Sequence, residues 1–114
     1  MVGTDTKNIY NYINSEVLEC MLSAYDFTAV KYIEDNGSVT LSLDQIDLAE
    51  YGENEDDALT KMAKGIIEYA EHYCQQSWWL AINRKAHAPY VARTLFINDV
   101  EKIKELIVCR LGEI

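Results

Sequence analysis

The sequence predicts a single α+β domain over residues 1–114, in which a small antiparallel sheet packs on one long helix. Three observations predict it. Apolar side chains recur with a helical period before residue 25 and again after residue 54, and with a strand period between them. The length of 114 residues suits one domain, and 49% hydrophobic with 25% charged residues is a globular composition.

The first predicted element is an N-terminal helix over roughly 6–24. Apolar side chains recur there at intervals of four, at Ile9, Ile13, Val17 and Met21. The apolar face is broader than one small sheet requires, which predicts a homodimer that covers the surplus. This surplus face carries Tyr10, Tyr12, Ile13, Val17 and Leu18.

A β-hairpin is the next predicted element. Residues 28–33 and 38–43 are rich in β-branched and aromatic side chains, and Asn36-Gly37 between them can supply the positive φ angles of a tight turn. The second run alternates apolar and polar residues, as a half-buried strand does. Residues 46–52 fit either a third short strand or a loop lying across the sheet.

A long helix is expected from Asn54, which can cap the first turn, to a point between residues 77 and 80. Acidic residues 55–57 favour the positive end of the helix dipole. One such helix on the open face of the hairpin would complete the core. Its apolar stripe consists of Leu59, Met62, Ala63, Ile66, Ile67, Ala70, Tyr73 and Cys74.

Short helices are predicted at the C-terminal end. Pro89 suits the first turn of a helix over 89–96, after a basic connection at 83–87. Asn98 is expected to cap the last helix, with Glu101 closing a capping box. Val100, Ile103, Leu106 and Ile107 would form the apolar side of that helix.

The charge balance favours a protein partner. Ten basic residues against 19 acidic ones give a formal charge of −9. Such acidity repels phosphate backbones and anionic membranes and suits a basic protein, although solubility alone also explains it. An odd set of three distant cysteines, the lack of a long apolar run and the lack of a signal peptide predict a cytoplasmic protein with reduced thiols.

No cofactor, metal ligand or catalytic residue is predicted. His72 and Cys74 could begin a metal site, but on a helix they point about 200° apart, and their spacing matches no zinc motif. An exposed histidine and a buried thiol are the simpler expectation. Glycine-rich phosphate loops, serine-nucleophile elbows and paired-histidine motifs are missing from the sequence. A non-enzyme is therefore favoured.

Acidic residues gather around the third predicted strand and the start of the long helix. They could hold magnesium in a metal-dependent hydrolase, dock a basic partner, or form a solvated surface that favours the helix dipole. These alternatives stay open on the sequence alone. The residues considered for partner binding are Asp44, Asp47, Glu50, Glu53 and Asp56.

A second candidate surface follows the long helix. Trp78 and Trp79 are neighbours, so on a helix they point about 100° apart, and one can be core while the other anchors an interface. Arg84 and Lys85 add basic charge close by. Aromatic and basic groups together can also bind single-stranded nucleic acid, but this is a small footprint on a chain of charge −9.

Beyond these patterns, the chain resembles the Phd-like antitoxins, which are partners of RelE-type toxins. The resemblance covers roughly residues 25–107. It is carried by the run 37–48, Gly52, the segments 57–59 and 68–71, the run Asn83-Arg84-Lys85-Ala86-His87-Ala88-Pro89-Tyr90-Val91 and the ending 98–107. The strand–strand–helix part is also similar to HicB-type antitoxin domains.

The resemblance implies a role in binding and neutralising a cognate toxin, often an RNA-cleaving one, and in some members repression of the shared operon. An acidic binder complements a basic, RNA-binding toxin. DNA binding in Phd-type proteins uses a basic N-terminal region, and here the stretch before Tyr25 has one basic residue, Lys7. A dimer would have to bring Arg84, Lys85 and Arg93 together for DNA contact. An orphan regulatory or structural dimer remains a further alternative.

Overall fold

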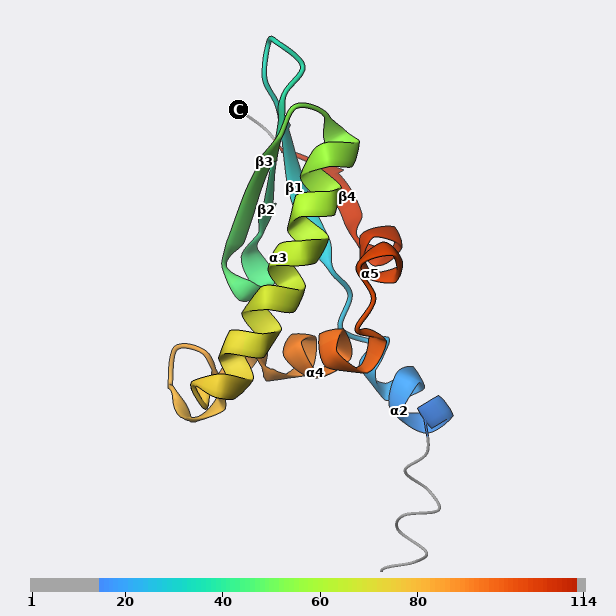
Figure 1. Ribbon diagram of the computed structural model, residues 1–114, viewed down its shortest axis with the longest axis vertical. Coiled ribbons are helices and arrows are strands. Elements are labelled where there is room, and N and C mark those ends of the chain that lie inside the picture. Colours follow the sequence, from blue (N-terminus) through green and yellow to red (C-terminus); the bar gives the residue numbers. More distant parts are fainter. Residues whose placement is uncertain (1–14, 113–114) are drawn as a thin grey trace, which may run out of the picture.

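The computed structural model describes residues 15–112, in which a four-stranded sheet is covered on one face by helices (Figure 1). The strand order is β3-β2-β1-β4. The strands are β1 (Thr28–Ile33), β2 (Val39–Leu43), β3 (Leu48–Gly52) and β4 (Val108–Leu111). The helices are α2 (Ser15–Leu22), α3 (Glu55–Gln75), α4 (Ala88–Ile97) and α5 (Val100–Leu106), with short 3-10 turns at Asp44–Ile46, Trp78–Leu80 and Lys85–His87.

The predicted hairpin is confirmed. β1 and β2 pair antiparallel, and the turn between them contains Gly37 at a φ of 89°. The backbone N–H of Glu34 donates to the carbonyl of Ser38 at 2.9 Å and closes the turn. Residues 48–52 form a third strand antiparallel to β2, so of the two alternatives for this segment the strand is the correct one.

The long helix α3 is also confirmed. Its N-cap is Asn54, whose side-chain oxygen accepts from the backbone N–H of Asp57 at 2.8 Å. The helix ends at Gln75, slightly before the predicted region, and Ser77 then takes a left-handed φ of 55°. α3 runs diagonally across the sheet, while α5 lies beside β4 and α4 crosses the lower end of the molecule (Figure 1).

The core lies between α3 and the sheet. Burying each large aliphatic or aromatic side chain contributes roughly 1.5–3 kcal/mol. Gly52 allows β3 to approach α3 closely, because a Cβ there would lie 2.3 Å from the backbone nitrogen of Ala58. The largest fully buried apolar side chains are Phe27, Leu41, Leu43, Ile46, Met62, Ile66 and Ile103.

Two expectations about the C-terminal end are wrong. Asn98 does not cap the last helix: it ends α4 in the left-handed conformation, and the cap is Asp99, which accepts from the N–H of Lys102 at 3.0 Å. Asparagine tolerates that conformation, so its neighbour takes the capping role. The fourth strand, β4, is not predicted from the sequence; it pairs parallel with β1 at the edge of the sheet.

The cysteine expectations need one correction. Cys74 is exposed rather than part of the buried stripe, because the last turns of α3 extend beyond the sheet and only the Tyr73 side is covered there. Cys109 lies in β4, half-buried, and burial raises the pKa of its thiol. His72 is exposed, as expected.

The N-terminal helix is described only from Ser15 onward. Within that part α2 runs to Leu22, and Tyr10, Tyr12 and Ile13 of the predicted dimer face lie outside the described residues. Between residues 15 and 112, no helix is long and apolar enough to cross a membrane.

Candidate functional site

The connection between α3 and α4, residues 76–87, is a compact loop at the lower end of the molecule (Figure 1). We call it the 76–87 loop. Its inner side is held by Arg84, whose guanidinium carbon lies 4.1 Å from the centre of the Trp78 ring. The same guanidinium donates to the hydroxyl of Tyr69 at 3.0 Å. A stacked cation of this kind stabilises by about 0.5–2 kcal/mol.

Two further hydrogen bonds tie the loop to α3. The hydroxyl of Tyr73 donates to the carbonyl of Arg84 at 2.7 Å, and the hydroxyl of Tyr69 lies 2.6 Å from Nδ1 of His87. His87 is only 6% exposed. Burial lowers the pKa of His87 below its usual value, although Asp47 acts in the opposite direction. The imidazole is therefore mainly neutral at pH 7.

The outer side of the loop carries three exposed large apolar side chains, beside the exposed polar residues Gln76, Asn83 and Lys85. Trp79 is 46% exposed, Leu80 is 76% exposed and Ile82 is 93% exposed. Trp78 packs against the buried Ala70 cluster, so the structure separates the two tryptophans into one inward and one outward ring. Leu80 and Ile82 were not among the residues predicted to bind a partner. The signal was present, because the apolar run 78–82 continues past the end of the α3 stripe.

Part of the acidic cluster lies beside this loop. Asp47 follows the 3-10 turn that begins at Asp44, and its carboxylate is 3.6 Å from Nε2 of His87. Glu50 lies farther along β3, against Gly65 of α3, and Glu53 follows the end of that strand. The structure thus brings Trp78, Trp79, Arg84, Lys85 and Asp47 to one end of the molecule, with Glu50 farther along β3 and Glu53 just past the end of that strand. Asp44 instead lines a hollow on the sheet with Tyr32 and Arg110.

Asp56 does not belong to this group. Its carboxylate is 2.6 Å from the Lys104 ammonium on α5, on the opposite side of α3 from β3. The other carboxylates also have separate partners: Asp44 accepts from Ser42, Glu55 pairs with Lys31, and Asp57 pairs with Lys61. Among residues 15–112, no group of three or more His, Cys, Asp or Glu is placed to hold a metal ion.

The basic residues are mostly committed to internal contacts. Arg93 is buried in α4, where its guanidinium donates to the carbonyl of Tyr25 at 2.6 Å and pairs with Asp26 at 3.3 Å. Arg84 stacks on Trp78, and Lys85 remains exposed. The three residues considered for DNA contact therefore do not form one exposed basic surface.

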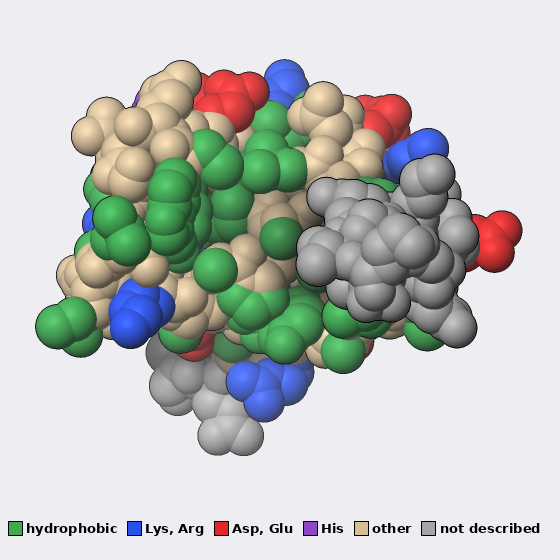
Figure 2. Space-filling model, turned by 90° about the horizontal axis from the view of Figure 1, so that it is seen from below, with side chains coloured by type: hydrophobic (Ala, Val, Ile, Leu, Met, Phe, Trp, Pro, Cys, Tyr) green, Lys and Arg blue, Asp and Glu red, His purple; other side chains and the backbone are tan. Residues whose placement is uncertain are grey.

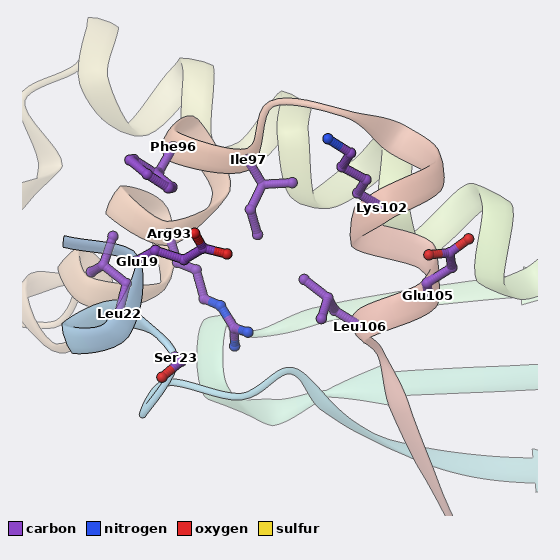
Figure 3. Close-up of a pocket in the computed structure, with 9 residues that line it drawn as sticks. All are labelled: Glu19, Leu22, Ser23, Arg93, Phe96, Ile97, Lys102, Glu105 and Leu106. Carbon is purple, nitrogen blue, oxygen red and sulfur yellow. The ribbon is translucent and has the colours of Figure 1, made fainter. Parts of the chain in front are cut away.

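A groove of about 330 Å³ lies between α2, α4 and α5 (Figure 3). Leu22, Phe96, Ile97 and Leu106 give it an apolar lining, with the charged side chains of Glu19, Arg93, Lys102 and Glu105 around them. Seen from this end, the molecule shows broad apolar areas with few charged groups among them (Figure 2). The groove and the 76–87 loop thus belong to the same, largely apolar end of the molecule.

Comparisons with known proteins agree with this architecture. A family model described as an antitoxin of RelE/RelB toxin–antitoxin systems matches residues 3–109. A crystal structure from Syntrophomonas wolfei subsp. wolfei, described as an antitoxin part of a proposed toxin/antitoxin system, superposes with a TM-score of 0.78 at 27% identity. The match covers 87% of this chain and 72% of that one. A search of curated proteins found no match.

The family match spans nearly the whole chain and includes β1 to β3, the long helix and the 76–87 loop. The solved antitoxin shares the same arrangement of those elements across most of the chain. The chain therefore belongs to the antitoxin family of RelE/RelB toxin–antitoxin systems and has an antitoxin role.

Proposed function

We propose that this antitoxin neutralises a RelE-type, RNA-cleaving toxin by direct binding and without catalysis. The family match over residues 3–109 carries the proposal. A toxin that cleaves RNA must bind a polyanion, so it is expected to be basic. The formal charge of −9 on this chain then accelerates association and helps to select the partner.

The contact surface that we propose joins the 76–87 loop to the β3 edge. Trp79 would contact the toxin with its exposed ring. The carboxylates of Asp44, Asp47, Glu50 and Glu53 would face basic groups of the toxin. Trp78 and Arg84 would act from within the loop, by holding its shape. Interfaces commonly combine an apolar anchor with a charged rim in this way.

Co-expression with the protein encoded by the adjacent gene tests this proposal. We expect a stable complex on gel filtration, and an affinity that falls as salt rises from 50 to 500 mM. Purified toxin should cleave RNA when it is alone and not in the complex. A complex that still cleaves RNA, or a toxin that never associates with this chain, would contradict the proposal.

We also propose that the chain forms a homodimer through its α2 end. The support is exposed apolar surface at that end: Met21 is 65% exposed, and the groove beside α2 has an apolar lining. Light scattering should give twice the monomer mass of 13.1 kDa. A measured mass of one chain at high concentration would contradict the dimer proposal and would leave the antitoxin proposal unaffected.

A further inference from the structure

We propose that Leu80 and Ile82 are the anchors with which this chain docks into an apolar pocket of its toxin. This inference rests on the proposed function, because it names the part of the surface that makes the decisive contact. It commits to a basic protein as the occupant, with a pocket large enough for two aliphatic side chains. Trp79 would lie at the margin of that contact.

The first support is exposure. Ile82 is 93% exposed and Leu80 is 76% exposed, the two highest values among the large hydrophobic side chains that the structure describes. They lie two residues apart in the 76–87 loop, Leu80 at the end of the 3-10 turn and Ile82 in the turn that follows, with Trp79 beside them at 46%. Scattered exposed apolar residues are ordinary, but several such side chains on one protruding turn are typical of an interaction site.

The second support is the way in which the turn is held. Arg84 stacks on Trp78, and the carbonyl of Arg84 accepts from the hydroxyl of Tyr73. His87 contacts both Tyr69 of α3 and Asp47. Trp78, Arg84 and His87 are thus used inward to fix the backbone of the loop, while Leu80 and Ile82 are exposed. A turn fixed before binding loses little conformational entropy when it docks.

The third support is charge, which favours a basic toxin over a second copy. The side chain of Asp47 is 78% exposed beside the loop, and its nearest basic group is His87, which burial keeps mainly neutral. Lys85 is the exposed cation of the loop itself. A second copy docked on this turn would bring its own Asp47 towards this one, whereas a basic protein is attracted to it.

The test compares two double variants in titrations with the protein encoded by the adjacent gene. The first is Leu80→Ser with Ile82→Ser. The matched control is Val108→Ser with Leu111→Ser on β4, where the side chains are 58% and 67% exposed. We expect the loop variant to weaken binding by roughly 100-fold or more, as the loss of two interface hot spots does. The control should stay within about 3-fold of wild type.

Three outcomes separate the claims. If the wild-type chain does not bind, the proposed function fails, and this inference fails with it. If the wild-type chain binds and the loop variant binds equally well, Leu80 and Ile82 are not anchors, and the antitoxin proposal stays intact. A loop variant that binds toxin normally but no longer self-associates would assign the turn to a second copy and would also overturn the inference. Ile82→Glu alone provides a second variant, checked for folding by circular dichroism.

Discussion

Apolar side chains are buried in the helix-on-sheet core, whereas several are exposed in the 76–87 loop. In the core, Phe27, Leu41 and Met62 are fully buried between α3 and the sheet. In the loop, aromatic and polar groups form the interior, and Leu80 and Ile82 face solvent. The first arrangement stabilises the fold through burial. In the loop, the aliphatic side chains stay exposed in the free chain, so their burial can contribute to the free energy of binding a partner.

The largest loss of stability should come from truncating a side chain of the core. Phe27→Ala removes a fully buried ring immediately before β1. We expect the free energy of unfolding to fall by about 3–5 kcal/mol, because the change loses buried area and leaves a cavity. Urea denaturation followed by circular dichroism measures this. A loss below about 1 kcal/mol would mean that the core does not carry the stability of the fold.

Arg84→Ala should have an intermediate effect, because it removes the brace and leaves the core intact. The stacking on Trp78 and the bond to Tyr69 are both lost, and we expect a cost of roughly 1–2 kcal/mol. Amide hydrogen exchange should rise in residues 76–87 and stay unchanged in β1 and β2. Lys85→Ala, on the exposed side of the same loop, is the matched control. If the amide hydrogen exchange of residues 76–87 is the same in Arg84→Ala and Lys85→Ala, then Arg84 does not fix the loop.

Acid should weaken the loop end through His87. Burial lowers the pKa of His87 in the folded chain below its unfolded value of about 6.5. The stabilisation is therefore complete above pH 6.5 and is lost as the pH falls through the folded pKa, by about 1.4 kcal/mol per unit of difference. Unfolding free energies at pH 7.5 and 5 should show this decline. His87→Gln should reduce it and the exposed His72→Gln should not; a decline unchanged by His87→Gln would contradict this assignment.

The smallest effect on stability is expected from Ile82→Ala. Its side chain is 93% exposed, so truncation changes little buried area, and we expect less than about 0.5 kcal/mol. Thermal denaturation beside Phe27→Ala measures the contrast directly. A cost of several kcal/mol would mean that Ile82 is covered in the free chain, for example by a second copy.

The sequence predicted the core better than the loop, for a physical reason. Strands and helices that bury one face repeat their apolar residues with a fixed period, so the sequence predicted the hairpin and α3, whereas it left the segment of β3 open between a strand and a loop. β4 was missed because four residues give little periodicity, and its parallel pairing with β1 depends on contacts far apart in the sequence. Asn98 and Asp99 are both good capping residues, and only the backbone conformation distinguishes their roles.

The candidate site was predicted in part. The sequence indicated one inward and one outward tryptophan, but it grouped Asp56 with carboxylates from which α3 separates it. The apolar run 78–82 was visible in the sequence, but a run of apolar residues looks the same whether it is buried or exposed, so Leu80 and Ile82 could not be identified as exposed. Exposure depends on how the loop folds back on α3, and that is set by contacts such as Tyr73 with Arg84.

The most direct test of the account is a titration of the toxin's RNA cleavage with this chain. A fixed amount of the protein encoded by the adjacent gene is mixed with increasing antitoxin, and cleavage of a labelled RNA is followed. Neutralisation by direct binding predicts that activity falls in proportion to the added chain and ends at a fixed molar ratio near equality. Inactivation by far less than equimolar chain would indicate catalysis, and cleavage that persists in excess chain would contradict neutralisation altogether.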